Sequence, residues 1–243
     1  MGWQPDSMSF WRLSRVPEPA AMDAADEVES YSSAAFQPHL AAIDDTFVEH
    51  LVRLLPKQPS PDEHSTWGLD VGSGPAQIPI SILRRIPVVR FIALDRFPNM
   101  LETARRNAQR AGGSDRLTLI RADAHKLPFA DHTFSIVICN SVLHHARSPV
   151  ELLLEIFRVA APEGAVLVRD LRRPSRPFLQ WHLWRHGRHY RGEMRRLFDA
   201  SVQAAYTVKE LERMLGQAGG HHAKVFCYRG AHLGIERPAR SAF

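Results

Sequence analysis

The sequence has little cysteine and no long apolar run. Its two cysteines, Cys139 and Cys227, each lie in an apolar stretch, where a free thiol usually packs as a small hydrophobe. They give no disulfide framework and no metal-type spacing, so we expect no bound metal and a reducing, cytoplasmic location. The first residues lack the apolar core of a secretory signal, and no run approaches the ~20 apolar residues that span a bilayer.

Negative charge is scarce in one part of the chain. The net charge is +5, and the region between Arg169 and Arg196 contains many arginines but only Asp170 and Glu193 as acids. This composition leaves two interpretations open. The arginines form a solvated surface, or they attract an anionic small molecule, a nucleic acid or acidic lipid headgroups.

Hydrophobic residues make up 44% of the chain, enough for a sizeable core, and their pattern predicts an α/β fold. Apolar residues at three- to four-residue steps predict a helix at 38–55. Strands are expected at 67–71, 88–94, 117–121, 134–139, 164–169, 223–229 and 231–236, and helices at 75–85, 98–111, 148–160 and 207–215. This alternation predicts a Rossmann-like, doubly wound, mainly parallel sheet of seven strands with helices on both faces.

Two segments outside this pattern are expected to cover a ligand site at the carboxyl ends of the strands. We expect residues 1–60 to form an N-terminal arm and a helix that cap it, and residues 61–243 to form the core. A basic and aromatic insert at about 171–200, after the fifth strand, is predicted to be a lid. Phe178, Trp181 and Trp184 fall on one helical face of it, which favours an apolar or aromatic small-molecule partner with an anionic group.

A glycine-rich turn follows the first strand, in the run Asp70-Val-Gly72-Ser-Gly74-Pro-Ala76. Glycines there let a ligand approach the backbone closely. A dinucleotide-binding turn has a third glycine, which is absent here. The second strand ends on Asp95, beside this turn in a parallel sheet, where a carboxylate can bind the hydroxyls of a ribose. The sequence therefore predicts a nucleoside-cofactor pocket.

This turn resembles the first motif of the class I S-adenosylmethionine-dependent methyltransferases, with Ala76 where a third glycine is common. Four further features occur in the order of that family: Asp95, and the segments 121–129, 135–145 and 158–168. The resemblance covers roughly residues 65–170 and is closest to the small-molecule methyltransferases. The run Arg15-Val-Pro-Glu-Pro with Met22-Asp23, and the segment 170–174, resemble a subgroup of unknown substrate.

The resemblance implies S-adenosylmethionine as the cofactor, S-adenosylhomocysteine as the product, and a set of cofactor-binding residues. Asp95 would bind the ribose, Asp123 and Ala124 the adenine, and the Asn140 carbonyl the ammonium group. The full predicted cofactor set is Tyr31, Asp70, Gly72, Gly74, Asp95, Arg96, Asp123, Ala124 and Asn140. His144 and His145 are the predicted acceptor contacts or catalytic bases, since an imidazole titrates near neutral pH.

Each of these roles has a structural alternative. Asp70 would only brace the turn, Asp123 would cap a helix, Tyr31 would pack against the core, and the two histidines would be structural. Cys139 is expected in the core.

The expected reaction is an in-line transfer of a methyl group to a small molecule. Alternatives are an RNA or protein methyltransferase that uses the arginine-rich insert, a non-catalytic regulator that binds S-adenosylmethionine, and a nicotinamide oxidoreductase. No Asn-Pro-Pro-Tyr follows the fourth strand, which disfavours methylation of planar nitrogens, and nucleic acid is the less favoured partner.

Overall fold

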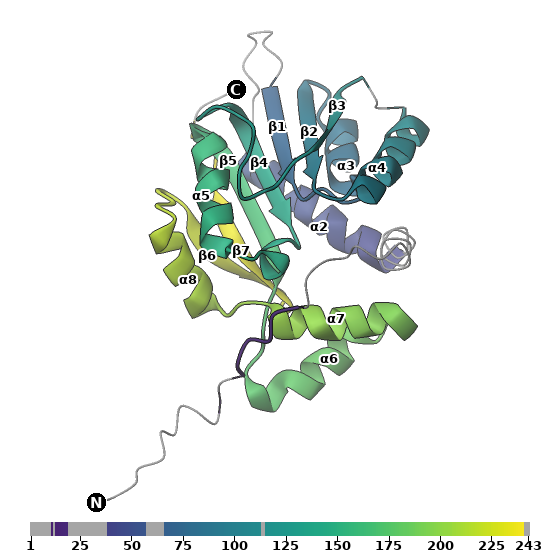
Figure 1. The fold of residues 1–243 in the computed structure, drawn as a ribbon, viewed down its shortest axis with the longest axis vertical. Helices are drawn as coiled ribbons and strands as arrows, with labels where there is room; N and C mark the ends of the chain where they lie inside the picture. The colour runs from purple at the N-terminus through teal and green to yellow at the C-terminus, as the bar shows by residue number, and fades with distance from the viewer. Residues whose placement is uncertain (1–10, 12, 19–37, 57–65, 113–114, 241–243) are drawn as a thin grey trace, which may run out of the picture.

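A seven-stranded sheet forms the centre of the molecule (Figure 1). The computed structural model describes residues 11, 13–18, 38–56, 66–112 and 115–240. The strands are β1 (Thr66–Val71), β2 (Val89–Asp95), β3 (Leu117–Arg121), β4 (Phe134–Asn140), β5 (Ala160–Leu171), β6 (Lys224–Tyr228) and β7 (His232–Arg237). Their order is β3-β2-β1-β4-β5-β7-β6; β7 pairs antiparallel with β5 and β6, and the other pairs are parallel. The predicted α/β class and strand number are confirmed.

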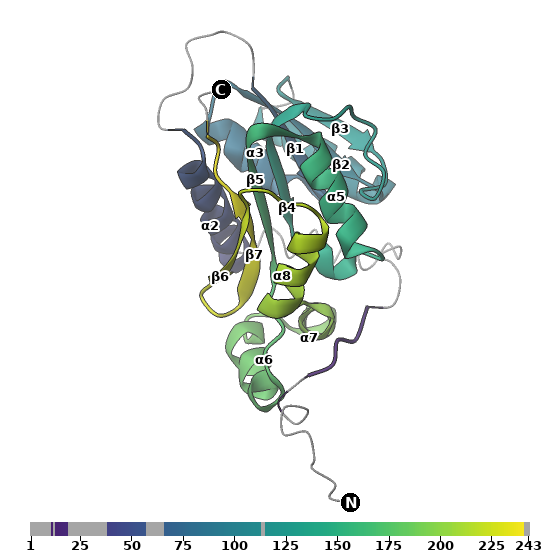
Figure 2. The ribbon, with the colours of Figure 1, turned by 90° about the vertical axis from the view of Figure 1, so that its left-hand side faces the viewer.

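Helices cover both faces of this sheet, as the two views show (Figures 1 and 2). One apolar cluster contains residues of α2 (Pro38–Leu54), α3 (Gln77–Arg85) and α4 (Pro98–Ala111). The other contains residues of α5 (Pro149–Val159) and α8 (Val208–Gln217). The core is therefore two apolar layers with the sheet between them.

Strand β4 shows why the chain folds in this way. Its run is continuously apolar, because Val137 and Cys139 contribute to one cluster and Ile136 and Ile138 to the other. All four side chains are fully buried. A strand in the middle of a parallel sheet is expected to be apolar on both faces for this reason.

Some predicted boundaries are shifted. Helix α3 begins at Gln77 rather than at residue 75, because Ala76 adopts a left-handed backbone conformation with φ 62°. Strand β5 is longer than the predicted 164–169, because Ala160 at its start pairs with β4 and Asp170 and Leu171 at its end pair with β7. The start of α8 is as expected: Thr207 accepts from the Glu210 N–H, and the Glu210 side chain accepts from the Thr207 N–H.

The insert after β5 contains a short 3₁₀ turn, η2 (Arg176–Phe178), and two helices, α6 (Leu179–Gly187) and α7 (Gly192–Ala204). Figure 1 shows both helices beyond the edge of the sheet toward which β4 points. Ligands of open α/β sheets bind at this carboxyl edge. In the described part of the chain, no helix is long and apolar enough to cross a bilayer.

Gly234 is predicted to be essential for the pairing of β7 with β5. A Cβ there would lie 2.0 Å from the Val168 carbonyl oxygen and 2.7 Å from the Phe226 ring. We expect Gly234→Ala to lower the free energy of unfolding by at least about 1–3 kcal/mol, as overpacking does. Gly216→Ala, in the last turn of α8 with nothing within 4 Å, is the control and should change stability little. Equal urea midpoints for the two variants would contradict this packing argument.

Candidate active site

The glycine-rich turn joins β1 to α3 with left-handed backbone at Gly72 (φ 73°) and Gly74 (φ 51°). The N–H groups of Gly72 and Ser73 donate to the carbonyl oxygen of Leu94, at 2.8 and 2.9 Å. A Cβ on Gly72 would lie 2.5 Å from a methyl carbon of Val142. The turn is therefore held against the end of β2, and glycine at position 72 is required by both conformation and space.

Asp95 connects the turn to the end of β2. Its Oδ2 accepts from the Gly74 N–H at 2.8 Å, and its Oδ1 accepts from the Phe97 N–H at 2.9 Å. Burial raises the pKa of Asp95 above its ordinary value, although these N–H groups act in the opposite direction. Each carboxylate oxygen has a second lone pair, so the group can still accept bonds from a ligand's hydroxyls.

Buried polar groups gather beside the turn: two side chains without a hydrogen-bond partner among the described residues, and one carboxyl. Ser73 Oγ and Gln77 Nε2 are buried with no hydrogen-bond partner among the described residues. Asp70 is only 2% exposed, and burial, followed by the charges of Asp95 and Asp44, raises its pKa well above the usual range. Buried polar groups are normally satisfied. Unsatisfied groups that line one cavity are therefore what a polar ligand would complete.

One cavity, of about 300 Å³, joins these groups. Its size is at the lower end of the range for small-molecule sites. All of the sequence-predicted site residues within the described ranges line it: Asp70, Gly72, Gly74, Asp95, Arg96, Asp123, Ala124, Asn140, His144 and His145. Tyr31 lies outside the described residues.

Two of these residues also have a structural role. Asp123 Oδ1 accepts from the His125 N–H and pairs with His125 Nδ1, each at 2.9 Å, so this carboxylate closes its own turn as well as lining the cavity. Asn140 Oδ1 accepts from Arg169 Nε at 3.2 Å. The Asn140 side chain is thereby held at the end of β4, while the chain turns away at Ser141 with φ 58°.

His144 is held in a fixed orientation by Asp170. The two residues are 3% and 1% exposed. Asp170 Oδ1 lies 2.6 Å from His144 Nδ1, and Oδ2 accepts from the His144 backbone N–H at 2.8 Å. Burial lowers the pKa of His144, but the charge and hydrogen bond of Asp170 outweigh burial and raise it above its ordinary value.

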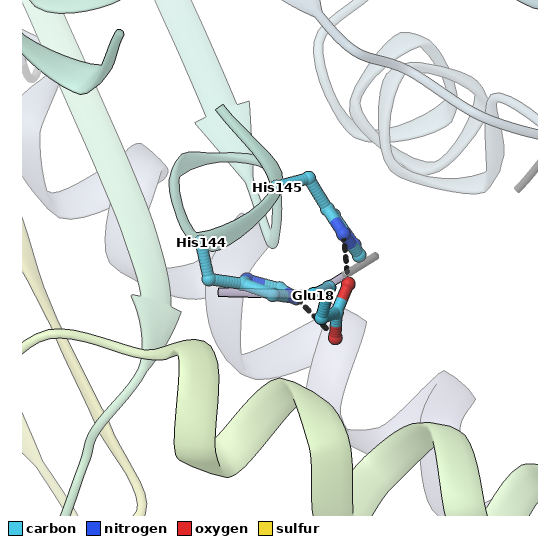
Figure 3. A group of neighbouring side chains, drawn as sticks. All are labelled: Glu18, His144 and His145. Atoms are coloured by element: carbon cyan, nitrogen blue, oxygen red, sulfur yellow. Dashed lines mark ion pairs between the residues drawn. The ribbon is translucent and has the colours of Figure 1, made fainter. Parts of the chain in front are cut away.

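Glu18 reaches the same place from residues 13–18, which we call the strap (Figure 3). Its carboxylate pairs with His145 Nδ1, lies 4.0 Å from His144 Nε2 and accepts from Ser201 Oγ at 2.6 Å. Burial raises the pKa of Glu18, but His145, His144 and Ser201 together lower it to about 2. Neither Glu18 nor Asp170 is among the sequence-predicted site residues, although both lie in segments that resemble the subgroup of unknown substrate.

The prediction that the aromatic residues of the insert cover the acceptor is wrong. Phe178 of η2 and Trp181 and Trp184 of α6 are 58%, 58% and 62% exposed and do not line the cavity, because their side chains face solvent. The apolar wall of the cavity comes instead from Tyr190, from Met194, Leu197 and Phe198 of α7, and from Leu40 and Ile43 of α2.

Comparison with known proteins agrees with this geometry. Residues 69–168 match the model of a methyltransferase domain family. The chain is 33% identical over 112 residues to the ubiquinone/menaquinone biosynthesis C-methyltransferase UbiE of Roseobacter denitrificans. The aligned residues make up 46% of this chain and 45% of that protein. It is 36% identical over 115 residues to a malonyl-[acyl-carrier protein] O-methyltransferase of Halorhodospira halophila, covering 47% of this chain and 38% of that protein. The chain thus spans less than half the length of these curated relatives.

Solved structures agree on the fold. A SAM-dependent methyltransferase from Aquifex aeolicus superposes with a TM-score of 0.63 at 17% identity, over 86% of this chain and 97% of that one. The plantazolicin methyltransferase BpumL, solved with S-adenosylhomocysteine, gives 0.65 at 14% identity, over 87% and 90%. With the family match, these findings identify residues 69–168 as a class I S-adenosylmethionine-dependent methyltransferase domain. S-adenosylmethionine is the cofactor of this family.

We expect Asp95→Ala to weaken S-adenosylmethionine binding more than His145→Ala does, by about tenfold or more. A hydrogen bond to a charged group is worth about 1.5–3 kcal/mol, and Asp95 also holds the turn through Gly74. Titration calorimetry measures both affinities, and thermal melting checks that each variant is folded. Equal affinities of wild type and Asp95→Ala would contradict this placement of the cofactor.

Proposed function

We propose that this protein transfers a methyl group from S-adenosylmethionine to a small-molecule acceptor by in-line displacement. The observation that carries the proposal is that one continuous cavity joins both halves of the site. It joins the glycine turn and Asp95 to an apolar wall from α2 and α7, and His144 and His145 line it too. A donor and an acceptor bound in one enclosed space can be aligned for direct transfer.

The residues present fit the cofactor. The space beside Gly72 is too narrow for a side chain, and Ser73 Oγ and Gln77 Nε2 are buried without partners in the described structure. When bound, S-adenosylmethionine supplies a methyl group already activated by a sulfonium charge. The protein then has mainly to bind, to orient and to exclude water.

We assign the donor half of the cavity as follows. Asp95 accepts from the ribose hydroxyls, while Asp123 and the Ala124 N–H face the adenine. Arg96 borders this part of the cavity, with its guanidinium 5.0 Å from the centre of the Phe97 ring. The Asn140 carbonyl faces the ammonium group. A cation held near Asp70 would offset the burial that raises the pKa of this carboxyl.

The acceptor half has a different character. Leu40, Ile43, Met194, Leu197 and Phe198 make it largely apolar. Asp44 also lines it, and burial raises the pKa of that carboxyl to about 6. We therefore propose an apolar or aromatic acceptor with few polar groups. Among the described residues that line the cavity, Arg96 is the only arginine, and none comes from the insert. An anionic group on the acceptor would therefore meet the arginines of the insert only outside the cavity.

His144 and His145 are our proposed acceptor contacts. Asp170 occupies Nδ1 of His144, so Nε2 is the atom left for the acceptor or for a group that binds it. The two relatives, by their names, methylate at carbon in one case and at oxygen in the other. This difference agrees with a protein whose main contribution is alignment rather than one fixed proton transfer.

The test of the proposed function is binding followed by turnover. We expect the full chain to bind S-adenosylmethionine and S-adenosylhomocysteine, but not NAD, in titration calorimetry. A strain that lacks the protein should accumulate a metabolite lighter by one methyl group than the corresponding species in its parent. The purified protein should convert that metabolite to the heavier one. Tight NAD binding without S-adenosylmethionine binding would overturn the proposal.

Two alternatives remain distinguishable by experiment. The exposed arginines Arg176, Arg185 and Arg188 favour an RNA substrate, which predicts RNA binding that weakens steeply with salt. A regulator would bind S-adenosylmethionine without turnover of any acceptor.

We also propose a cytoplasmic location. Cys139 and Cys227 are both free thiols, the state in which reducing conditions keep cysteines.

A further inference from the structure

Three side chains of kinds that can bind a metal ion point toward one another (Figure 3), and all three line the cavity. Glu18 comes from the strap, and His144 and His145 come from the 3₁₀ turn η1 (Leu143–His145) after β4. One donor atom from each, a carboxylate oxygen or a ring nitrogen, lies within 4.8 Å of the other two. Residues distant in sequence thus bring two imidazoles and one carboxylate together around one point.

The state of His144 shows that this point lacks a group. Its Nε2 is buried and has no hydrogen-bond partner in the described parts of the chain. The nearest carboxylate oxygen, on Glu18, is 4.0 Å away, which is too far for a hydrogen bond. A ring nitrogen and a carboxylate oxygen that face each other across such a gap leave room for a cation between them. Bonds of about 2.0–2.2 Å to a tetrahedral metal ion would draw the two donor atoms somewhat closer together than they lie here.

Asp170 prepares His144 for such a role. Histidines that bind metals usually donate their other ring N–H to a carboxylate, which fixes the tautomer and the ring orientation. Asp170 accepts at His144 Nδ1 and also from its backbone N–H. Ser201 Oγ steadies the Glu18 carboxylate in a comparable way, at 2.6 Å. Both outer groups are already present in the structure.

Arg15, a cationic side chain close to His144, does not fill the gap. Arg15 donates from Nε to the Ala204 carbonyl oxygen at 2.6 Å and from Nη2 to the His144 carbonyl oxygen at 2.9 Å, and it stacks on the Tyr206 ring. Its guanidinium is thus directed at backbone carbonyls rather than at the carboxylate. Glu18 and Asp170 together bring two negative charges, which suits a divalent ion.

We propose that Glu18, His144 Nε2 and His145 Nδ1 form a binding site for a divalent transition-metal ion of the zinc class. Two imidazoles and a glutamate are a ligand set of catalytic zinc, and three protein ligands leave a position open. Nitrogen ligands disfavour magnesium and calcium, which take oxygen. Binding requires Glu18 and His145, which pair directly in the structure, to separate and admit the ion.

The open position faces the acceptor, and this consequence rests on the proposed function. All three ligand residues line the cavity that holds the donor pocket. A zinc ion there would bind an oxygen or nitrogen atom of the acceptor and favour transfer of its proton to water. The two imidazoles then act on the acceptor through the ion.

The site is tested by zinc binding to the full chain. Protein treated with a chelator is titrated with Zn²⁺ against a chromophoric chelator, and Co²⁺ is added separately to record its visible absorption. We expect stoichiometric Zn²⁺ binding and a Co²⁺ spectrum. His145→Ala and Glu18→Gln should weaken Zn²⁺ binding by about 100-fold, and Asp170→Asn by about 10–100-fold. The matched controls His221→Ala and Glu212→Gln, both at exposed positions, should bind as wild type does.

S-adenosylmethionine binding is measured on the same samples, so that folding and function are separated from the metal. A variant that keeps this binding but loses zinc supports the site. Wild-type protein that binds S-adenosylmethionine but no stoichiometric zinc overturns the metal site and leaves the proposed function intact. Zinc binding unchanged by both His145→Ala and Glu18→Gln also overturns it. Zinc binding without S-adenosylmethionine binding overturns the proposed function instead.

Discussion

The cavity depends on the carboxylate of Asp95, which fixes the glycine turn to the end of β2. It bonds backbone N–H groups on both sides, at Gly74 and Phe97. The turn adds two bonds of its own to the Leu94 carbonyl. Because these contacts set the position of the turn, they also set where α3 begins and which polar groups face the cavity.

The sheet and the glycine turn are largely predictable from the sequence, for a physical reason. Strands buried on both faces must be apolar throughout, as β4 is, and turns with left-handed backbone favour glycine, as at positions 72 and 74. Parallel strands bring their carboxyl ends to one edge, so Asp95 and Asn140 are expected near the turn without knowledge of the rest. The capping box of Thr207 and Glu210 is similarly local.

The acceptor side of the cavity and the orientation of the insert are not predictable in this way. Glu18, His144 and Asp170 have no sequence spacing in common, because the fold alone brings them together. The orientation of α6 also depends on tertiary packing: a periodic aromatic face indicates a helix side but not whether that side faces the protein or solvent. At Ala76 the sequence departs from glycine, yet the backbone keeps a positive φ, so the local preference is overridden by the turn around it.

The strap reaches the cavity beside His144 and His145, through Glu18. It is attached to η1 and to the end of α7 through Arg15 and through the Val16 N–H, which donates to the Gln203 carbonyl oxygen at 3.1 Å. Glu18 adds its pair with His145 and the bond from Ser201. A segment held by such polar contacts, outside the sheet and the helices, opens locally at a lower free energy than the sheet does. Release of the strap would therefore uncover the acceptor without disturbing the turn at Gly72. With the proposed acceptor and cofactor in place, the methylated acceptor would have an exit separate from that of the nucleoside, and the architecture would then favour its release first.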